Sequence, residues 1–523
     1  MSSTEIKPSA PPRFTFPLYK HYSLKNQEVA YADGAPSLSS PIKTRFPPNV
    51  FPILPSPTSP GSPATPTTSF GLSRQLPDPH AKIYKVVNCR LLQDHKIVEN
   101  SYLWFQNGRI IKPEDLFFTS YREPDEIIDA KGLLIAPGFI DLQINGAFGV
   151  DFTTDAESGK SDEELVKDIE KVSRGLLKYG CTSYLPTVVS SKTGVYHKAL
   201  PLLRPRPGSV LAGAEILGAH IEGPFIAEGK KGAHNPNVLS AAPRGITDLD
   251  ARYGPELAFK KPDARGDIER AVRLITIAPE LEGLLEAVPE LVSRGITVSI
   301  GHSEARIADA EAAVAKGTTF ITHLFNAMQA FHHRDPGIIG VLGSTHLPIP
   351  ISHKHHPSPS ITSPSPTKPD PRPFYGLICD GVHCHPNSVK IAYYSHPRGA
   401  ILVTDALSSM GLPPGTYSLA GRTIIVDDKL GAYIEGTTTL AGSTITIDAC
   451  VRNFVRFTGC SLVEAIDAAT IHPAKLLGIE KRKGALRIGA DADLVFLDDS
   501  QGPENIVVSR VFVRGEEVDL KAC

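Results

Sequence analysis

The sequence predicts an α/β fold in which an eight-stranded (β/α)8 TIM barrel is joined to a small β-sandwich domain. From Pro137 onward, apolar runs of strand length alternate with helical stretches, which is typical of repeated βα units around a parallel sheet. Short alternating runs flank this region on both sides and indicate half-buried strands. Four of the central runs also end in a residue that can bind or serve a metal, as expected where the strand ends of a barrel converge.

The barrel elements can be placed along the chain from these runs. Three stretches with helical character each end in a glycine, which can take the left-handed conformation that closes a helix; they cover residues 162–180, 281–295 and 303–317. Eight runs are the candidate strands: residues 138–144, 182–189, 215–222, 274–280, 297–302, 318–324, 375–381 and 399–406.

The flanking segments predict a second, composite domain. Residues 81–136 contain short strand-like runs separated by the turn pairs Asn107-Gly108 and Lys131-Gly132. Residues 417–523 return to short strands and end in two candidate hairpins. We expect these two segments to form one small β-sandwich domain and residues 137–416 to form the metal-dependent catalytic barrel.

Two proline-rich segments are expected to be disordered. Residues 1–80 hold 16 of the 46 prolines and show no sustained helical or strand period, so they are predicted to be a disordered arm. Residues 346–373 hold nine prolines and are predicted to be a flexible insertion in the barrel. His353, His355 and His356 lie in this insertion, where a solvated linker is a better interpretation than a metal site without rigid support.

Composition favours a small-molecule partner. The 523 residues carry a formal net charge of -2, which gives no electrostatic reason to expect nucleic acid or an anionic membrane as a partner. The seven cysteines are scattered without CxxC pairs, as suits a reducing compartment. No apolar stretch approaches the roughly 18 residues that a membrane helix needs. We therefore expect a cytoplasmic protein.

Three strand ends offer a set of metal ligands. Glu222, His302 and His323 each follow an apolar run, and a hydrolytic zinc site needs three such ligands plus an open position for water. His302 and His323 are separated by about one helix and one strand, so they fit the ends of adjacent strands. For a lone histidine, a satisfied core or cap residue would be the better interpretation. That alternative would have to hold three times at matching positions, so we favour the ligand set.

Two further strand ends carry candidate catalytic groups. Asp405 follows the run AILV, where a carboxylate can take a proton from a metal-activated water and pass it to a leaving amine. Capping of the following helix is an equally good explanation for Asp405 taken alone. Asp380 and His383 follow another strand; the imidazole could polarise a carbonyl or hold a hydroxyl, or be an ordinary turn histidine.

Several other polar side chains near the strand ends could bind an anionic substrate. Arg334 carries a guanidinium that matches phosphate, although an ion pair with Asp335 is the simpler explanation. His234 and Asn326 are possible sugar or phosphate contacts, each weak on its own.

The motifs taken together resemble the N-acetylglucosamine-6-phosphate deacetylase family of the amidohydrolase superfamily. The resemblance runs from about residue 82 to the C-terminus, and its ordered motifs are PGFIDLQINGAFGVDF, AHIEGPFI, KKGAHNPN, IGHSEA, THLFNAM, DGVHCHP, VTDALSSMG, LAGSTITID, ATIHPAKLLG and GADADLVFLD. It implies the barrel with its β-sandwich domain, hydrolysis of an acetamido group to glucosamine 6-phosphate and acetate in amino-sugar catabolism, and a homodimer in which His234 reaches a neighbouring site.

The resemblance also implies roles for individual residues. Glu222, His302 and His323 match the metal ligands, and Asp405 matches the catalytic acid/base, with His383 assisting the carbonyl. The positions that match substrate contacts are Ala233, His234, Asn326, Ala327, Arg334, Asp380, Gly381, Val382, His383, Leu440, Ala441 and Gly442.

The opening of the barrel favours one metal ion per subunit. The superfamily often has an HxH pair there that binds a second metal, but this chain has Gln143-Ile144-Asn145, and amides are poor zinc ligands. We expect a single divalent ion, with zinc as the expected metal. His220 keeps a second ligand position open.

Two other functions remain open at this stage. One is a different amidohydrolase, such as a cyclic amidase or a nucleobase deaminase, although neither the HxH pair nor a metal-bridging lysine is evident. The other is a non-catalytic binding or scaffolding protein that works through the proline-rich arm. The intact set of Glu222, His302, His323 and Asp405 argues against it.

Overall fold

The computed structural model describes residues 80–115, 122–258, 270–348, 370–427 and 431–523. The predicted arm and the predicted insertion lie outside these residues except at their edges, and so do His353, His355 and His356. Among the helices described, none combines the length and the apolar character that crossing a membrane requires.

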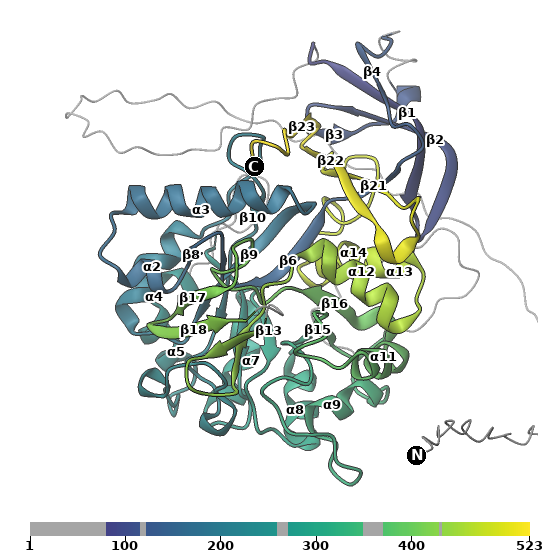
Figure 1. Cartoon of the computed structure of the whole chain (residues 1–523). Coiled ribbons are helices and arrows are strands. Elements are labelled where there is room, and N and C mark those ends of the chain that lie inside the picture. Colours follow the sequence, from purple (N-terminus) through teal and green to yellow (C-terminus); the bar gives the residue numbers. More distant parts are fainter. Residues whose placement is uncertain (1–79, 116–121, 259–269, 349–369, 428–430) are drawn as a thin grey trace, which may run out of the picture. The chain divides into compact units, whose positions relative to one another are not determined.

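The centre of the fold is a nearly closed barrel of eight parallel strands (Figure 1). Each predicted run contains a strand, and the run at 215–222 is divided between β10 (Glu215–Ile216) and β11. Consecutive strands pair in parallel from β6 through β9 and β11 to β16, while β10 pairs with β9 outside this path. The barrel strands are β6 (Phe139–Ile144), β9 (Cys181–Val189), β11 (Ala219–Glu222), β12 (Val272–Ile277), β13 (Thr297–Ile300), β14 (Phe320–Ile321), β15 (Phe374–Ile378) and β16 (Ala400–Val403).

Helices surround the barrel strands and bury their apolar faces against them (Figure 1). The first long helix, α3, begins with a capping box in which Ser161 Oγ accepts from the Glu164 N–H and the Glu164 carboxylate accepts from the Ser161 N–H. Gly317, with φ of 119°, closes α8 as expected. The helices are α2 (Thr154–Glu157), α3 (Asp162–Leu177), α4 (Thr193–Leu202), α5 (Ile246–Tyr253), α6 (Pro255–Ala258), α7 (Leu284–Ser293), α8 (Ile307–Lys316), α9 (Gly337–Gly340) and α11 (Pro386–Ser395).

A second sheet combines strands from before and after the barrel. Its order is β23-β22-β21-β5-β1-β2-β3, with β4 paired to β1. This pairing supports the proposed composite domain, whose boundaries stay a prediction. The strands are β1 (Ile83–Gln93), β2 (Lys96–Gln106), β3 (Arg109–Ile110), β4 (Glu126–Asp129), β5 (Leu134–Pro137), β21 (Leu494–Asp498), β22 (Val507–Val513) and β23 (Glu516–Glu517).

The region after the barrel contains more than this sheet. A separate four-stranded antiparallel sheet follows β16, and three helices then pack residues into the barrel core. These elements are β17 (Gly415–Leu419), β18 (Arg422–Val426), β19 (Ala432–Ile434), β20 (Leu440–Gly442), α12 (Ile447–Thr458), α13 (Leu462–Asp467) and α14 (Ile471–Leu476). A small hairpin of β7 (Gly146–Ala147) and β8 (Val150–Asp151) follows β6.

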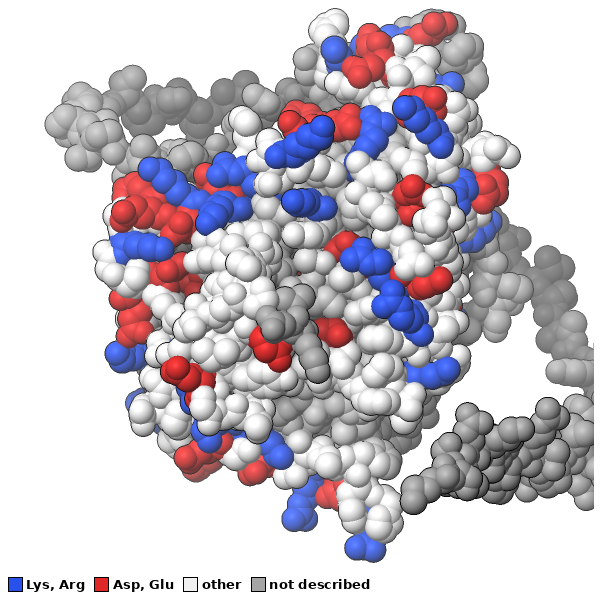
Figure 2. Space-filling view, in the orientation of Figure 1, with Lys and Arg blue, Asp and Glu red and all other residues white. Residues whose placement is uncertain are grey.

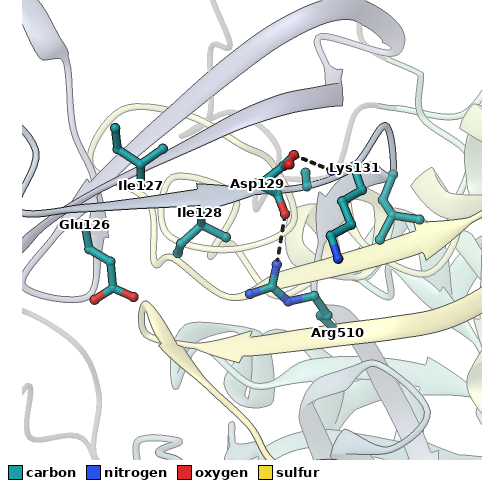
Figure 3. Close-up of a pocket in the computed structure, with 8 residues that line it drawn as sticks. Glu126, Ile127, Ile128, Asp129, Lys131 and Arg510 are labelled. Atoms are coloured by element: carbon teal, nitrogen blue, oxygen red, sulfur yellow. Dashed lines mark hydrogen bonds between the residues drawn. The ribbon is translucent and has the colours of Figure 1, made fainter.

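The surface of the small sheet has a hollow without any of the predicted site residues. Residues 126–131 and Arg510 line it, and Arg510 reaches the backbone carbonyl of Asp129 (Figure 3). The Arg510 guanidinium also lies over the rings of Phe496 and Phe512, so its role here is packing within the sheet. On the face in Figure 2, acidic and basic side chains are interspersed, in line with the near-neutral formal charge of -2.

A buried ion network joins the small sheet to the barrel. Lys483 lies 2.9 Å from Glu215 of β10 and 3.3 Å from Asp491, and it also contacts Asp493. Arg482 pairs with Glu215 at 2.6 Å and with Asp491 at 2.8 Å. Burial alone would raise the pKa of Glu215, but Lys483 and Arg482 lower it to about 2. Arg109 also pairs with Asp491 at 2.8 Å, so three cationic side chains accompany the three carboxylates, and we assign no metal to this cluster.

Replacing Lys483 with methionine should destabilise the protein strongly. The change removes one buried cation of the network and leaves Asp493 without its ion-pair partner, which costs about 3–5 kcal/mol of unfolding free energy. The matched control is Lys316→Met, because Lys316 forms an exposed pair with Glu286 at 3.4 Å; its loss should cost less than about 1 kcal/mol. Urea unfolding of the two variants measures the difference, and equal effects would contradict the importance of the network.

Candidate active site

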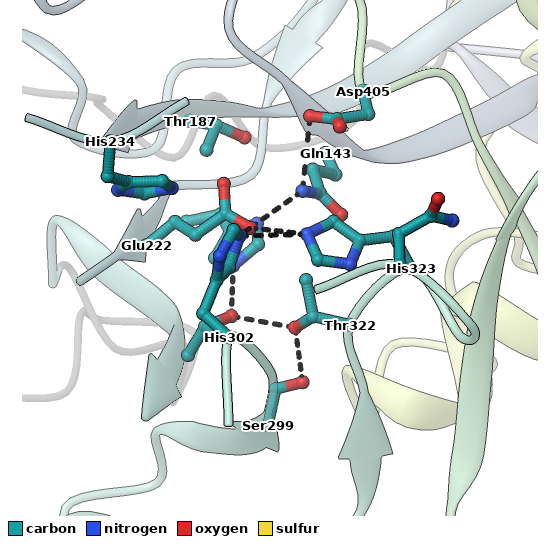
Figure 4. Close-up of polar contacts among 12 residues, drawn as sticks. Gln143, Thr187, Glu222, His234, Ser299, His302, Thr322, His323 and Asp405 are labelled. Carbon is teal, nitrogen blue, oxygen red and sulfur yellow. Dashed lines mark hydrogen bonds and ion pairs between the residues drawn. The ribbon is translucent and has the colours of Figure 1, made fainter. Parts of the chain in front are cut away.

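The predicted strand-end residues meet at one rim of the barrel (Figure 4). Glu222 is the last residue of β11, and His302, His323 and Asp405 each lie two residues beyond β13, β14 and β16. All four side chains are buried, with exposures of 2%, 5%, 4% and 8%. Sequence-distant residues are thus brought together because parallel barrel strands all end on the same side.

Three of these residues have an unusual backbone. His302, His323 and Asp405 have positive φ values of 49°, 27° and 48°. Non-glycine residues rarely adopt this left-handed region, and such strain concentrates at functional sites. Each residue is therefore held in a conformation that its own backbone does not favour, by the contacts of the surrounding structure.

The donor atoms of Glu222, His302 and His323 face a common point. Glu222 Oε1 lies 3.2 Å from His302 Nε2 and 3.0 Å from His323 Nε2, and the two Nε2 atoms are 3.0 Å apart. Ligands bonded to zinc at about 2.0–2.1 Å in a tetrahedron lie about 3.4 Å from one another. Two imidazole nitrogens and one carboxylate oxygen at nearly this spacing fit a divalent metal ion.

The loop after β11 fixes the orientation of His302. His302 Nδ1 lies 2.8 Å from the Lys230 carbonyl oxygen. A carbonyl can only accept, so His302 Nδ1 carries the proton and donates it. The Nε2 atom of the neutral ring is then left with a free lone pair, as a metal ligand requires. In return, the Ala227 N–H donates to the His302 carbonyl at 2.9 Å, so the loop holds this residue on two sides.

For both Glu222 and His323, the effect of burial on the pKa is opposed by the effect of the neighbouring charge. Burial opposes ionisation of Glu222, but the adjacent rings of His302 and His323 hold its pKa well below the usual value. Burial likewise opposes protonation of His323, but the Glu222 carboxylate raises its pKa. The pocket thus favours a negative charge on Glu222 balanced by a positive charge beside it, which a metal ion can supply.

Asp405 lies next to the ligand set and is held by two amides. Asn145 Nδ2 donates to Asp405 Oδ1 at 2.8 Å, and Gln143 Nε2 donates to the same oxygen at 3.2 Å and to Glu222 Oε1 at 3.0 Å. Burial, together with the nearby charge of Glu222, raises the pKa of Asp405 to about 6. A carboxylate with this pKa is suited to exchange protons near neutral pH.

His220 is engaged with hydroxyl groups in the barrel interior. Its Nε2 contacts Thr276 Oγ1 at 2.7 Å, and this hydroxyl contacts Thr322 Oγ1 at 2.7 Å inside the barrel. Burial lowers the pKa of His220 to about 4, so the ring is neutral. Because its Nε2 contacts the Thr276 hydroxyl, His220 belongs to the hydrogen-bonded polar groups inside the barrel.

A cavity of about 230 Å³ opens above these residues. Most of the predicted substrate positions contribute to its lining, and the sheet β17–β20 covers part of it. The predicted residues that line it are Glu222, Ala233, His234, His302, His323, Asn326, Ala327, His383, Asp405, Leu440, Ala441 and Gly442.

His234 presents an N–H group toward this cavity. Its Nδ1 accepts from the Ser190 backbone N–H at 3.3 Å, and Ser190 Oγ lies 2.7 Å from the same atom. Since a backbone N–H can only donate, the proton of the neutral ring is on Nε2. Burial, with the neighbouring His302, lowers the pKa of His234 to about 3, so the ring stays a neutral donor.

His383 is supported by Asp380. The Nδ1 atom of His383 lies 2.6 Å from Asp380 Oδ2, while Asp380 Oδ1 accepts the backbone N–H groups of Val382 and His383 at 2.8 Å each. Burial opposes ionisation of Asp380, but His383 lowers its pKa. Of the predicted segment 380–383, only His383 lines the cavity, and Asp380 orients it.

Arg334 is not brought to the cavity. It is exposed, and its guanidinium lies 3.1 Å from the His333 ring. Gly381 and Val382 are also exposed and do not line the cavity. Among the described residues that line the cavity there is no lysine or arginine. The predicted phosphate contact of Arg334 is therefore not assembled within the single chain.

Sequence reasoning did not find several residues that shape the site. The sequence indicates Gln143 and Asn145 only as replacements for metal ligands, yet their amides orient Asp405. Ser190 follows β9, and the same strand-end rule could have found it. Leu419 and Thr439 line the cavity from the sheet β17–β20, and no local pattern in the sequence indicates that this sheet reaches the rim.

Comparisons with known proteins point in one direction. Residues 134–518 match the model described as Amidohydrolase family. N-acetylglucosamine-6-phosphate deacetylase of Danio rerio is 43% identical over 439 residues, covering 84% of this chain and 97% of that protein. The enzyme of the same name from Caenorhabditis elegans is 38% identical over 450 residues, covering 86% and 97%. The crystal structure of N-acetylglucosamine-6-phosphate deacetylase from Pasteurella multocida has a TM-score of 0.65 at 26% identity, covering 83% of this chain and 99% of that one.

Replacing Glu222 with glutamine should remove the bound metal. The substitution keeps the shape of the side chain but removes the charge that the two imidazoles and the cation share. After reconstitution with zinc and dialysis, plasma emission spectroscopy should find about one ion per wild-type chain and far less in Glu222→Gln. His383→Asn is the control and should keep its metal. A fully loaded Glu222→Gln protein would contradict the ligand assignment.

Proposed function

Since the chain belongs to the amidohydrolase family, we propose that it hydrolyses N-acetyl-D-glucosamine 6-phosphate to D-glucosamine 6-phosphate and acetate. The observation that carries the proposal is the placement of Asp405 beside the three convergent donor atoms of Glu222, His302 and His323. The relatives named N-acetylglucosamine-6-phosphate deacetylase support the choice of substrate.

We further propose that Glu222, His302 and His323 hold one divalent ion, with zinc as the expected metal. The donor set suits zinc, and the amides at Gln143 and Asn145 favour a single ion. When bound, such an ion supplies Lewis-acid activation of a carbonyl oxygen and of water.

The other side chains transfer the protons and hold the catalytic groups in place. Ionised Asp405 accepts a proton from the attacking water and returns it to the amine as the C–N bond breaks. Gln143 and Asn145 hold the receiving carboxylate in place. His383, oriented by Asp380, faces the cavity to assist the acetamido carbonyl or a sugar hydroxyl.

A phosphate contact needs a cation that the described lining of the cavity does not include. His234 and Arg334 are the predicted phosphate contacts. The ring of His234, however, lies against that of His302, with centroids 4.4 Å apart. We therefore propose that the N–H of His234 donates to a substrate oxygen near the ligand set. Arg334 remains our proposed phosphate contact. In the expected homodimer, this arginine can come from the second chain. The homodimer, the cytoplasmic location and the place in amino-sugar catabolism stay predictions.

Replacing Asp405 with asparagine should leave the metal bound and remove most turnover. Asparagine is a mild test, because it tolerates the left-handed backbone at this position. The loss of a general acid/base should lower kcat by about 10²–10⁴-fold.

Acetate release is the assay for N-acetylglucosamine 6-phosphate and N-acetylglucosamine. Ring opening of a cyclic amide is followed by chromatography, and deamination of a nucleobase by the release of ammonia. Wild-type protein should act on the phosphorylated sugar alone. Near-normal turnover by Asp405→Asn would contradict the role of Asp405, and a preference for the cyclic amide or the nucleobase would contradict the proposed substrate.

The rate should fall in acid. The pKa of Asp405 is raised to about 6, so the carboxylate becomes protonated as the pH falls through this value and can no longer accept a proton. A bound cation lowers this pKa, so the acid limb of kcat against pH should have an apparent pKa of about 6 or below. A limb with a midpoint above neutrality would show that another group controls the rate.

A further inference from the structure

The barrel has a seam between its first and last strands. In the described part of the chain, no strand ladder joins β6 to β16; only an isolated bridge pairs Ile144 with Ala406 at the rim. Unpaired strand edges leave backbone N–H and C=O groups that need other partners when they are buried. The contacts that replace the ladder therefore decide how β16, and Asp405 after it, lie relative to β6.

The lower part of the seam is filled by the segment after α13. The Leu402 N–H donates to the Ala468 carbonyl at 2.9 Å, and the Ile140 N–H donates to the Ala469 carbonyl at 2.8 Å. These two residues thus separate the strands and satisfy one N–H group from each.

The middle of the seam is spanned by the carboxylate of Asp141. Asp141 Oδ2 accepts from the Thr404 hydroxyl at 2.6 Å, and Oδ1 accepts from the backbone N–H groups of Thr404 and Gln143 at 3.2 Å each. The side chain is only 1% exposed, so these protein donors are its means of compensating for lost hydration. One side chain on β6 thereby holds the residue that immediately precedes Asp405.

The rim of the seam completes the support of Asp405. The Asp405 N–H donates to the Gln143 carbonyl at 2.8 Å, and the Ser443 N–H donates to the Asp405 carbonyl at 2.9 Å. Thr404 directly precedes Asp405, and Gln143 bonds both the backbone N–H and the carboxylate of Asp405, so the two residues bonded to Asp141 also help to place Asp405. A backbone with φ of 48° at Asp405 needs such external support.

We propose that Asp141 is a positioning residue for the deacetylation, acting through Thr404 and Gln143 to place the Asp405 carboxylate beside the metal ligands. The inference rests on the proposed function, in which Asp405 moves the proton. Asp141 does not line the cavity, so it acts only through its neighbours. Small displacements of a proton-transfer group are costly, with about 1 Å worth up to about 100-fold in rate.

The test compares two substitutions of the partner hydroxyl. Thr404→Val removes the hydroxyl that donates to Asp141 Oδ2 and keeps the shape, whereas Thr404→Ser keeps the hydroxyl. With zinc-loaded protein, Thr404→Val should lower kcat by about 10- to 100-fold with little change in KM or metal content. Thr404→Ser should stay within about threefold of wild type. Asp141→Asn should resemble Thr404→Val.

A stability control separates positioning from general weakening of the barrel. Val298→Ala opens a cavity at a fully buried position of β13, away from the seam. Its Tm should fall at least as far as that of Thr404→Val, while its kcat stays near wild type. If kcat followed Tm in all variants, or if Thr404→Val kept normal kcat, the positioning role would be overturned.

A structural measurement distinguishes failure of this inference from failure of the proposed function. If wild-type protein releases no acetate from N-acetylglucosamine 6-phosphate, the proposed function fails. The inference is then decided by the crystal structure of zinc-loaded Thr404→Val. Loss of the Asp405 contact with Asn145 would support it, and an unmoved Asp405 carboxylate would overturn it.

Discussion

The site depends on the mutual approach of three buried lone-pair donors. Glu222 Oε1 and the Nε2 atoms of His302 and His323 lie 3.0–3.2 Å from one another, and the bond from His302 Nδ1–H to the Lys230 carbonyl leaves Nε2 of the neutral ring as a lone-pair donor. A shared cation relieves this crowding and compensates for the burial of the carboxylate. Burial, together with the nearby charge of Glu222, also raises the pKa of Asp405.

Holding that arrangement has a structural cost that the rest of the barrel offsets. Three strand-end residues have left-handed backbones, and each strained residue typically costs about 1–3 kcal/mol. Contacts from neighbouring elements compensate for this cost. The loop after β11 is hydrogen-bonded to His302, and residues along the seam between β6 and β16 are hydrogen-bonded to Asp405. The buried network around Lys483 attaches the small sheet to β10, and none of its residues lines the cavity.

Much of the fold and the centre of the site could be predicted from the sequence, because both depend on local patterns. The eight apolar runs each contain a strand, and the rule that parallel strands end together brought Glu222, His302, His323 and Asp405 to one place. The residues of the cavity rim were harder to predict from the sequence. Arg334 and the sheet with Leu440 are placed by contacts between distant segments, which no periodicity records. The proton positions of His234 and His302 likewise depend on Ser190 and the Lys230 carbonyl, which are distant in sequence.

The most direct test of the account is a titration of metal-free protein with zinc, following acetate release from N-acetylglucosamine 6-phosphate at each step. One ion held by Glu222, His302 and His323 beside a single Asp405 predicts that turnover rises linearly and stops rising at about one equivalent per chain. A rise that continues to two equivalents would contradict the single-ion site. Turnover that is complete before any metal is added would contradict the role of the ligand set itself.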